Sequence, residues 1–263
     1  MLKKIIILSA WVLSITGLIV LLAFENTKNK DVLCKQIDIN IDYQSEMYFI
    51  SEDDVLDLIK CFEGEIKGKK MEIIKIFEIE NLLNSNPFIL HADVYATIDG
   101  MIKINIQQRK PIIRIINNKN ESFYIDNNGK EMPLNSKYPS RTVIASGNII
   151  DTYVSTVCLD TIGNKIYDSI IKKSTLYKIY QLAQYIDNNE FLKAQINQIY
   201  LNNENEFELI PSVGKNIILF GDIDDMKEKF DKLIVFYLKG LNAIGWNKYK
   251  FINLKYKNQV VCS

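Results

Sequence analysis

The sequence predicts an α+β protein with an N-terminal transmembrane helix, a small β-α-α-β-β domain and a strand-rich β domain with helical insertions. Three observations lead to this prediction: an uncharged apolar run near the start, a segment in which strand and helix periods follow one another, and many short strand-like segments after it. The predicted boundaries are 1–4 for a short tail, 5–24 for the transmembrane helix, 25–35 for a tether, 36–109 for the small domain, 110–260 for the β domain and 261–263 for a tail.

The first predicted element is the apolar run from Ile5 to Phe24, which contains no charged residue. A helix rises about 1.5 Å per residue, so the run matches a hydrocarbon core of about 30 Å. A cleaved signal peptide would have a shorter core and a small-x-small site, and a lipoprotein would have a cysteine directly after the run. Residues 22–25 offer no such site, and Cys34 comes too late. The run therefore predicts an uncleaved anchor, and the short tail favours a cytoplasmic N-terminus and an exported body.

The composition gives no sign of a polyanionic partner. Lysine plus arginine and aspartate plus glutamate both total 32, so net charge gives no reason to expect nucleic acid or a polyanionic substrate. The four cysteines, at 34, 61, 158 and 262, form no C-x-x-C pair. In an exported body, a Cys34–Cys61 disulfide and unpaired thiols both remain open.

The small domain is predicted to begin with one strand and two helices. Residues 37–42 alternate strictly between apolar and polar, as a half-buried strand does. Ser51, with Asp54 three residues later, is a helix N-cap signal. The stripe of this first helix is Val55, Leu58, Ile59 and Phe62, and a second helix near 74–84 has the stripe Ile76, Ile79, Leu82 and Leu83.

The domain is predicted to end with a β-hairpin. Pro87 breaks the helical pattern, and the apolar positions of the next strand are Ala92, Val94, Ala96 and Ile98. Asp99-Gly100 predicts a two-residue turn with positive φ at both positions. The return strand carries Ile102, Ile104 and Ile106 on one face. This order predicts a small sheet with both helices on one face.

After Arg109-Lys110-Pro111 the pattern changes to short strands. The predicted strands are 112–116, 122–126, 141–145, 195–201, 206–210, 216–220 and a closing strand at 251–257, with a tight turn at Asn128-Gly129. Two helices are inserted among them. One covers 174–187, and the other is capped by Asp222 and Asp225 and has the stripe Met226, Phe230, Leu233, Tyr237 and Leu241.

Residues that carry chemistry are few. His91 is the only histidine, so two-histidine metal sites are excluded, and neither a P-loop nor a G-x-S-x-G motif occurs. Two S-x-x-K strings start at Ser169 and Ser212, but such short strings arise by chance and their companion motifs are absent. The acidic groups at 52–54 and 222–225 suit helix N-termini. We therefore predict no catalytic residue, no cofactor, no metal ion and no small-molecule substrate.

The order of these segments resembles the bacterial cell-division family FtsQ/DivIB, whose exported part is a POTRA domain followed by a β domain. Residues 104–112 resemble its V-x-E-R-x-P junction, residues 124–130 its Y-[LV]-[VI]-D-x-x-G turn, and residues 251–256 its closing [YI]-D-L-R-Y strand. Residues 86–94 and 221–223 are similar to the entry of the second POTRA strand and to the start of the late helix. Gln108 and Asn253 depart from the family, which often has Glu and Asp there.

The resemblance implies a non-enzymatic scaffold of the division complex that links its assembly to septal cell-wall synthesis. It implies FtsB- and FtsL-like proteins and other divisome members as partners. It also implies a single-pass type II protein of the cell inner (cytoplasmic) membrane at the division septum, with a periplasmic or extracytoplasmic body. The sequence leaves open whether the envelope has an outer membrane.

The closing strand is the predicted partner-binding surface. A strand at a sheet edge offers N–H and C=O groups to which a partner segment adds as a further strand. On the resemblance, the edge near 249–257 is this surface, and Ile252, Leu254 and Tyr256 face the core. The outward candidates are Tyr249, Phe251, Asn253, Lys255 and Lys257. The alternative is a strand that only closes the sheet.

Two other functions remain open. A POTRA-bearing transport or secretion component would bind other chains by strand addition, and the sequence of one such domain does not separate that role from division. A membrane-tethered cell-wall enzyme would use Ser169 or Ser212 as its nucleophile.

Overall fold

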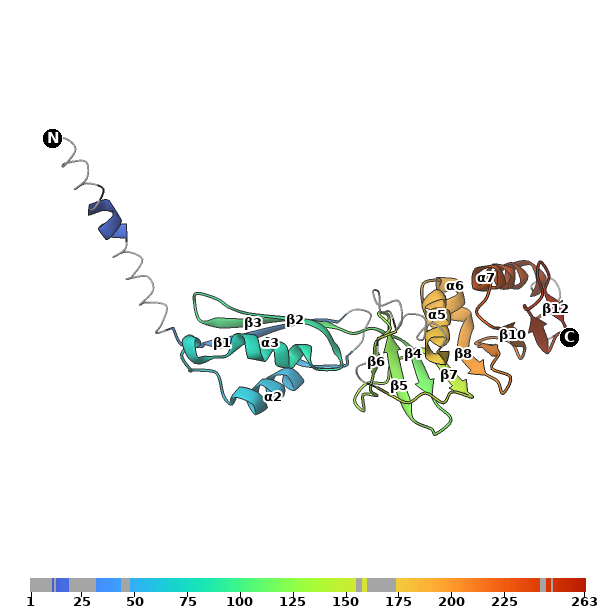
Figure 1. Cartoon of the computed structure of the whole chain (residues 1–263), viewed down its shortest axis with the longest axis horizontal. Coiled ribbons are helices and arrows are strands. Elements are labelled where there is room, and N and C mark those ends of the chain that lie inside the picture. The colour runs from blue at the N-terminus through green and yellow to red at the C-terminus, as the bar shows by residue number, and fades with distance from the viewer. Residues whose placement is uncertain are drawn as a thin grey trace. The chain divides into compact units, whose positions relative to one another are not determined.

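The computed structural model describes residues 11, 13–18, 32–43, 48–154, 158–159, 174–241, 245–246 and 248–263. The chain divides between Gln108 and Arg109 into two compact units, unit 1 and unit 2, each with its own buried core. Unit 1 is a small α/β sheet domain and unit 2 is rich in strands (Figure 1). The predicted α+β class, with a small domain before a β domain, is confirmed.

The predicted transmembrane helix lies mostly outside the described residues. Residues 11 and 13–18 are helical, and more than half of the surface of each of their large apolar side chains is exposed: Trp11, Leu13, Ile15 and Leu18. No helix within the described ranges is both long and apolar enough to cross a bilayer. The anchor therefore stays a prediction.

Unit 1 is a three-stranded sheet in the order β1-β3-β2, with its helices on one face (Figure 1). β1 runs parallel to β3, and β2 is antiparallel to it. The elements are β1 Gln36–Asp42, α2 Glu52–Glu63, the 3₁₀-helix η2 Met71–Ile73, α3 Ile76–Asn84, β2 Ile89–Ala96 and β3 Met101–Gln108. The predicted capping box at Ser51 and Asp54 is present. Val55 and Ile59 of the predicted stripe are buried, but Phe62 is exposed.

The β2–β3 hairpin differs from the predicted two-residue turn. Gly100 has a φ of +87°, but Asp99 is not left-handed. The Gly100 N–H donates to the Thr97 carbonyl, and the Thr97 N–H donates to the Met101 carbonyl. The loop is therefore longer than the predicted two residues, and the left-handed Gly100 ends it. This loop spares Asp99 the steric cost of a left-handed conformation. Ile98, predicted on the buried face of the strand, lies in the loop and is 87% exposed.

Residues 32–35, predicted as the end of the tether, are instead part of unit 1. Leu33 pairs with Lys70, and the Cys34 and Lys35 N–H groups donate to the carbonyls of Lys69 and Gly100. Cys34 is buried, and burial raises the pKa of its thiol. Cys61 is exposed on α2, and both cysteines are free thiols. The structure therefore has no Cys34–Cys61 disulfide.

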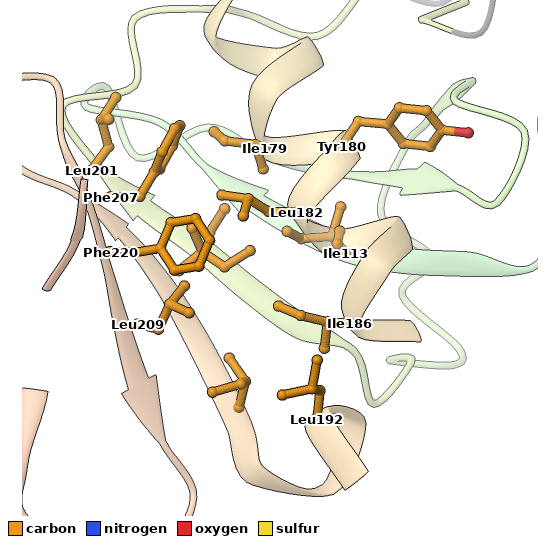
Figure 2. Close-up of a cluster of buried hydrophobic side chains, with 14 of the residues drawn as sticks. Ile113, Ile179, Tyr180, Leu182, Ile186, Leu192, Leu201, Phe207, Leu209 and Phe220 are labelled. Carbon is orange, nitrogen blue, oxygen red and sulfur yellow. The ribbon is translucent and has the colours of Figure 1, made fainter. Parts of the chain in front are cut away.

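Unit 2 is a nine-stranded sheet in the order β12-β11-β10-β9-β8-β7-β4-β5-β6. Helices α5, α6 and α7 cover one face of it (Figure 1). Ile179, Leu182 and Ile186 of α5 pack on sheet residues such as Ile113 and Phe220 (Figure 2). The elements are β4 Pro111–Ile116, β5 Ser122–Asp126, β6 Glu131–Met132, β7 Val143–Gly147, α5 Thr175–Asp187, α6 Glu190–Gln195, β8 Ile196–Leu201, β9 Phe207–Pro211, β10 Ile217–Gly221, α7 Met226–Val235, the π-helix η3 Phe236–Leu241, β11 Phe251–Asn253 and β12 Val261–Cys262.

The capping prediction for α7 is wrong. Asp225 stands at the N-cap position with a φ of +53°, and its side chain makes no capping hydrogen bond. The Asp222 carboxylate instead accepts hydrogen bonds from Lys178 Nζ on α5 at 2.8 and 2.6 Å. The acidic group therefore ties the start of α7 to α5, a contact between residues 44 positions apart that local sequence does not reveal.

A buried carboxyl on β6 makes the stability of unit 2 depend on pH. Glu131 is 2% exposed, and its Oε2 accepts a hydrogen bond from the Val154 N–H at 2.6 Å. Burial raises the pKa of Glu131 to about 7, and the nearby Asp151 adds to the shift. A raised pKa means that the folded protein holds this proton more tightly than the unfolded chain does. The resulting stabilisation is full below the ordinary pKa of 4.5 and is lost as pH rises to about 7.

We expect Glu131→Gln to remove this pH dependence, because glutamine still accepts the Val154 hydrogen bond without becoming charged. At pH 8 the variant should have a free energy of unfolding roughly 2–3 kcal/mol above that of the parent, and at pH 4.5 the two should be nearly equal. Denaturant unfolding at the two pH values measures the difference. Glu204→Gln, at an exposed turn, is the control. An equal effect of Glu131→Gln at both pH values would contradict the prediction.

Candidate protein-interaction surface

The C-terminal edge of the unit 2 sheet is not the predicted one. β11 ends at Asn253 and lies between β10, which is parallel to it, and β12, which is antiparallel. The prediction that residues 251–257 form the edge strand is therefore wrong. The edge is β12, Val261–Cys262, which lies within the residues predicted as a tail, 261–263. A two-residue strand has no period to detect, and the β-branched Val260-Val261 pair was the only signal for it.

The open side of β12 presents the backbone of Cys262. Phe251 and Ser263 exchange hydrogen bonds, with the Phe251 N–H donating at 2.9 Å and the Ser263 N–H at 3.1 Å. Bonded and non-bonded pairs alternate along an antiparallel ladder, so the next pair, Ile252 and Cys262, is non-bonded. The Cys262 N–H and C=O therefore point away from β11, toward the open edge of the sheet.

The turn between β11 and β12 is held by α7. Lys232 Nζ donates to the carbonyls of Leu254 at 3.3 Å and Tyr256 at 2.6 Å. Asn258 has a φ of +58°, and its N–H donates to Glu228 Oε1 at 3.4 Å. Because the chain turns here, Tyr256 is 50% exposed and not part of the core, contrary to the prediction. These contacts position β12 at the edge of the sheet.

The five predicted partner-binding residues occupy three settings. Phe251 and Asn253 are half-buried on β11, and Ile252 and Leu254 between and after them are buried as predicted. Tyr249 precedes the strand and is half-buried, while Lys255 and Lys257 follow it and are exposed. The structure therefore brings Phe251, Asn253 and Lys255 to one side of the chain and leaves Lys257 in the turn.

Asn253 belongs to the helix-free face, defined here as the face of the unit 2 sheet opposite α5, α6 and α7. On this face, residues that are direct cross-strand partners on successive strands form one row, and its members are half-buried or exposed. The row consists of Ser146, Tyr200, Glu208, Leu219, Asn253 and Val261. The β12 edge and the outward residues of β11 therefore form one continuous surface, which we call the C-terminal surface.

Lys255 already has a partner within the chain. Its Nζ lies 2.8 Å from Glu206 Oε2, and this hydrogen bond raises the pKa of the lysine. Its methylene groups cover Gly221, where an added Cβ would lie 3.0 Å from them. Reversal of the Lys255 charge alone would therefore disturb the fold of this corner as well as any partner contact.

The last segment of the chain is rich in lysine although the chain as a whole is neutral. Residues 248–263 contain four lysines and neither aspartate nor glutamate. Lys248 Nζ lies 5.7 Å from the centre of the Tyr249 ring, and Lys250 Nζ lies 5.3 Å from that of Phe251. Aromatic rings with adjacent ammonium groups, next to an open strand edge, suit an extended partner segment that carries carboxylates.

The β2 edge of unit 1 is closed by α3 side chains. The Ala92 N–H donates to Asn84 Oδ1 at 2.9 Å, and Asn84 Nδ2 donates to the Ala92 carbonyl at 3.0 Å. The Val94 N–H donates to Glu80 Oε2 at 3.0 Å. These groups are the ones that an added strand would need. This contact disfavours strand addition at β2, one of the two edges of the sheet.

The residues considered for catalysis form no site in the described ranges. Ser169 lies outside the described residues. Ser212 is exposed in a bend, so Lys215 is not one helical turn from it. His91 is exposed and pairs with Asp93 at 2.9 Å. Over the part of the chain that the structure describes, no cluster of His, Cys, Asp and Glu could hold a metal ion.

Comparison with known proteins gives matches over both units. Residues 110–263 match the family model described as FtsQ/DivIB, C-terminal related, and residues 32–107 match that of a POTRA-like domain. A known protein, "Cell division protein DivIB" of Clostridium tetani (strain Massachusetts / E88), is 25% identical over 191 residues. The aligned part covers 72% of this chain and 66% of that protein, so the chain spans just under two thirds of the relative's length.

Proposed function

The chain belongs to the FtsQ/DivIB family, and on this premise we propose that it is a non-enzymatic scaffold of the bacterial cell-division complex. Its partners are FtsB- and FtsL-like division proteins, and through them it links assembly of the complex to septal cell-wall synthesis. The similarity to a cell-division DivIB protein supports the division role and a place at the septum.

The proposed scaffold is anchored by the apolar run at 5–24. The exposed apolar side chains of the described helical residues 11 and 13–18 support this, because water disfavours such surface and lipid does not. The proposed topology is type II in the cytoplasmic membrane, with a cytoplasmic N-terminus and both units on the exported side.

The proposed binding site is the C-terminal surface. An acidic segment of the partner adds to the open side of β12 and contacts the five residues Tyr249, Phe251, Asn253, Lys255 and Lys257. The observation that carries the proposal is the outward direction of the Cys262 N–H and C=O at the end of the sheet, beside β11, which is flanked by lysines on both sides. Backbone pairing supplies affinity in this mode, and side-chain contacts supply specificity.

Truncation of an aromatic side chain on this surface tests the proposal. We expect Phe251→Ala to weaken co-purification of the full chain with FtsB- and FtsL-like proteins by about tenfold or more, since buried aromatic anchors dominate such interfaces. Tyr200→Ala is the matched control, because Tyr200 lies on the same sheet face three strands away. Equal losses for both variants, at unchanged unfolding temperature, would move the site away from β11.

A charge swap separates a partner contact of Lys255 from its internal ion pair. Lys255→Glu alone loses the bond to Glu206 and places two carboxylates together. Adding Glu206→Lys restores the pair in reverse. We expect the double variant to recover the unfolding temperature but to remain at least several-fold weaker in partner binding. Full recovery of binding in the double variant would show that Lys255 acts only within the fold.

A further inference from the structure

One end of unit 1 carries a group of large apolar side chains that face solvent. Ile98 is 87% exposed, Phe77 is 72% exposed and Ile73 is 59% exposed. Leu33 and Phe62, also at this end, are each close to half exposed. We call these five residues the apolar end of unit 1. Isolated exposed apolar residues are ordinary, but a group of this kind marks an interaction surface.

Hydrogen bonds place Leu33, Phe62, Ile73 and Ile98 at the same end, and Phe77 follows Ile73 in the first turn of α3. Leu33 pairs with Lys70, three positions before Ile73, and the Lys35 N–H donates to the carbonyl of Gly100, two positions after Ile98. Lys69 Nζ donates to the Glu63 carbonyl, which brings the end of α2 and Phe62 to this site. The opposite end of the unit holds Gln108, whose Oε1 accepts the N–H groups of Phe49 and Ile50 at the start of α2.

The apolar end is also where the described chain of unit 1 begins. The Met71 N–H donates to the carbonyl oxygen of Val32, and the apolar run of the sequence ends at Phe24. The intervening residues reach at most about 3.5 Å each. The apolar end is therefore held within about 30 Å of the last residue of the proposed anchor, whatever path the chain takes.

We propose that the apolar end of unit 1 rests on the membrane surface, with Ile73, Phe77 and Ile98 in the headgroup region. The proposal depends on the membrane anchor of the proposed function. Apolar side chains enter the interface to depths of about 5–10 Å. Exposed lysines at 35, 67 and 70 are accompanied by exposed Glu72 and Asp99, so apolar contact and not net charge drives the association. The contact would fix the orientation of unit 1 above the bilayer.

Quenching by brominated lipid tests the contact with the full chain in phosphatidylcholine vesicles. In a Trp11→Phe background, Ile98→Trp and Phe77→Trp place a fluorophore at the apolar end. Tyr48→Trp places one at a 55% exposed position near Phe49, at the opposite end. The emission of each is taken as the difference from the Trp11→Phe parent, which retains Trp246. We expect strong loss of emission for the first two and little for the third.

A measurement on the native chain tests the membrane anchor separately from the surface contact of unit 1. Bromolipid should quench native Trp11, because the proposed anchor contains it. Quenching of Trp11 together with equal, weak quenching at positions 48, 77 and 98 would overturn the surface contact and leave the anchor intact. If Trp11 escapes quenching, the anchor is wrong and the membrane contact that depends on it falls as well.

Discussion

Arg109→Ala should lower the free energy of unfolding of unit 2 by about 3–5 kcal/mol, because it leaves a buried carboxylate without its counterion. Arg109 Nη1 lies 2.7 Å from Asp126 Oδ2, and the two side chains are 9% and 0% exposed. The other oxygen of this carboxylate, Asp126 Oδ1, accepts hydrogen bonds from the N–H groups of Asn128 and Lys130 at 2.9 and 2.8 Å. The pair therefore fixes the first residue of unit 2 to the turn after β5.

The neighbouring Lys110 provides the control. Lys110 Nζ lies 3.3 Å from Asp187, but the lysine side chain is 35% exposed and Asp187 has a second partner in Lys193. Partly exposed pairs of this kind contribute at most about 1 kcal/mol, so Lys110→Ala should have little effect. The free energy of unfolding of both variants is measured by denaturant unfolding, with a unit 2 signal such as Trp246 fluorescence as the probe. A loss below about 1 kcal/mol for Arg109→Ala would contradict the account.

Gly147→Ala should cost about 3–4 kcal/mol, because the position requires glycine for two reasons. Its φ is +108°, a conformation that side chains rarely adopt, and an added Cβ would overlap the backbone of Leu201 on the paired strand β8. A backbone neighbour cannot move aside as a flexible side chain can, so the β7–β8 ladder in the middle of the sheet must open.

Gly245→Ala separates the two reasons. Gly245 has a similar φ of +100°, but its Cβ position is open space. Its substitution should cost only the conformational term, about 1–2 kcal/mol. Thermal or denaturant unfolding of the three proteins gives the comparison. Equal destabilisation by both alanines would mean that the contact with Leu201 relaxes without loss of pairing.

Sequence reasoning succeeded where the signal is local. Ser51 and Asp54 are three residues apart and make the predicted capping box, and the six short strands predicted before the closing strand correspond to β4, β5, β7, β8, β9 and β10. The α5 helix begins after Ser174, where its pattern placed it. Such features depend on neighbours within one turn or one strand, and the pattern therefore carries them.

Sequence reasoning failed where tertiary contacts decide. The closing strand was predicted too long because its alternation continues to Lys257, whereas Lys232 on α7 turns the chain after Leu254. Lys255 was predicted as free surface because Glu206 is 49 residues away. The β12 edge is too short for any period. For the interaction surface, the sequence therefore supplied the residues of β11 and their alternation, but neither the edge strand nor the internal partner of Lys255.

The central claim, that a partner strand adds to β12, depends on the backbone N–H of Cys262. Cys262→Pro removes that donor from the open side, where proline is tolerated because the bonds to β11 come from its neighbours. Cys262→Ala keeps the donor and is the control. Both variants of the full chain should unfold near the parent temperature. The account predicts that Cys262→Pro weakens binding of FtsB- and FtsL-like partners by tenfold or more, while Cys262→Ala binds them as the parent does. Equal binding by the two variants would contradict strand addition at this edge.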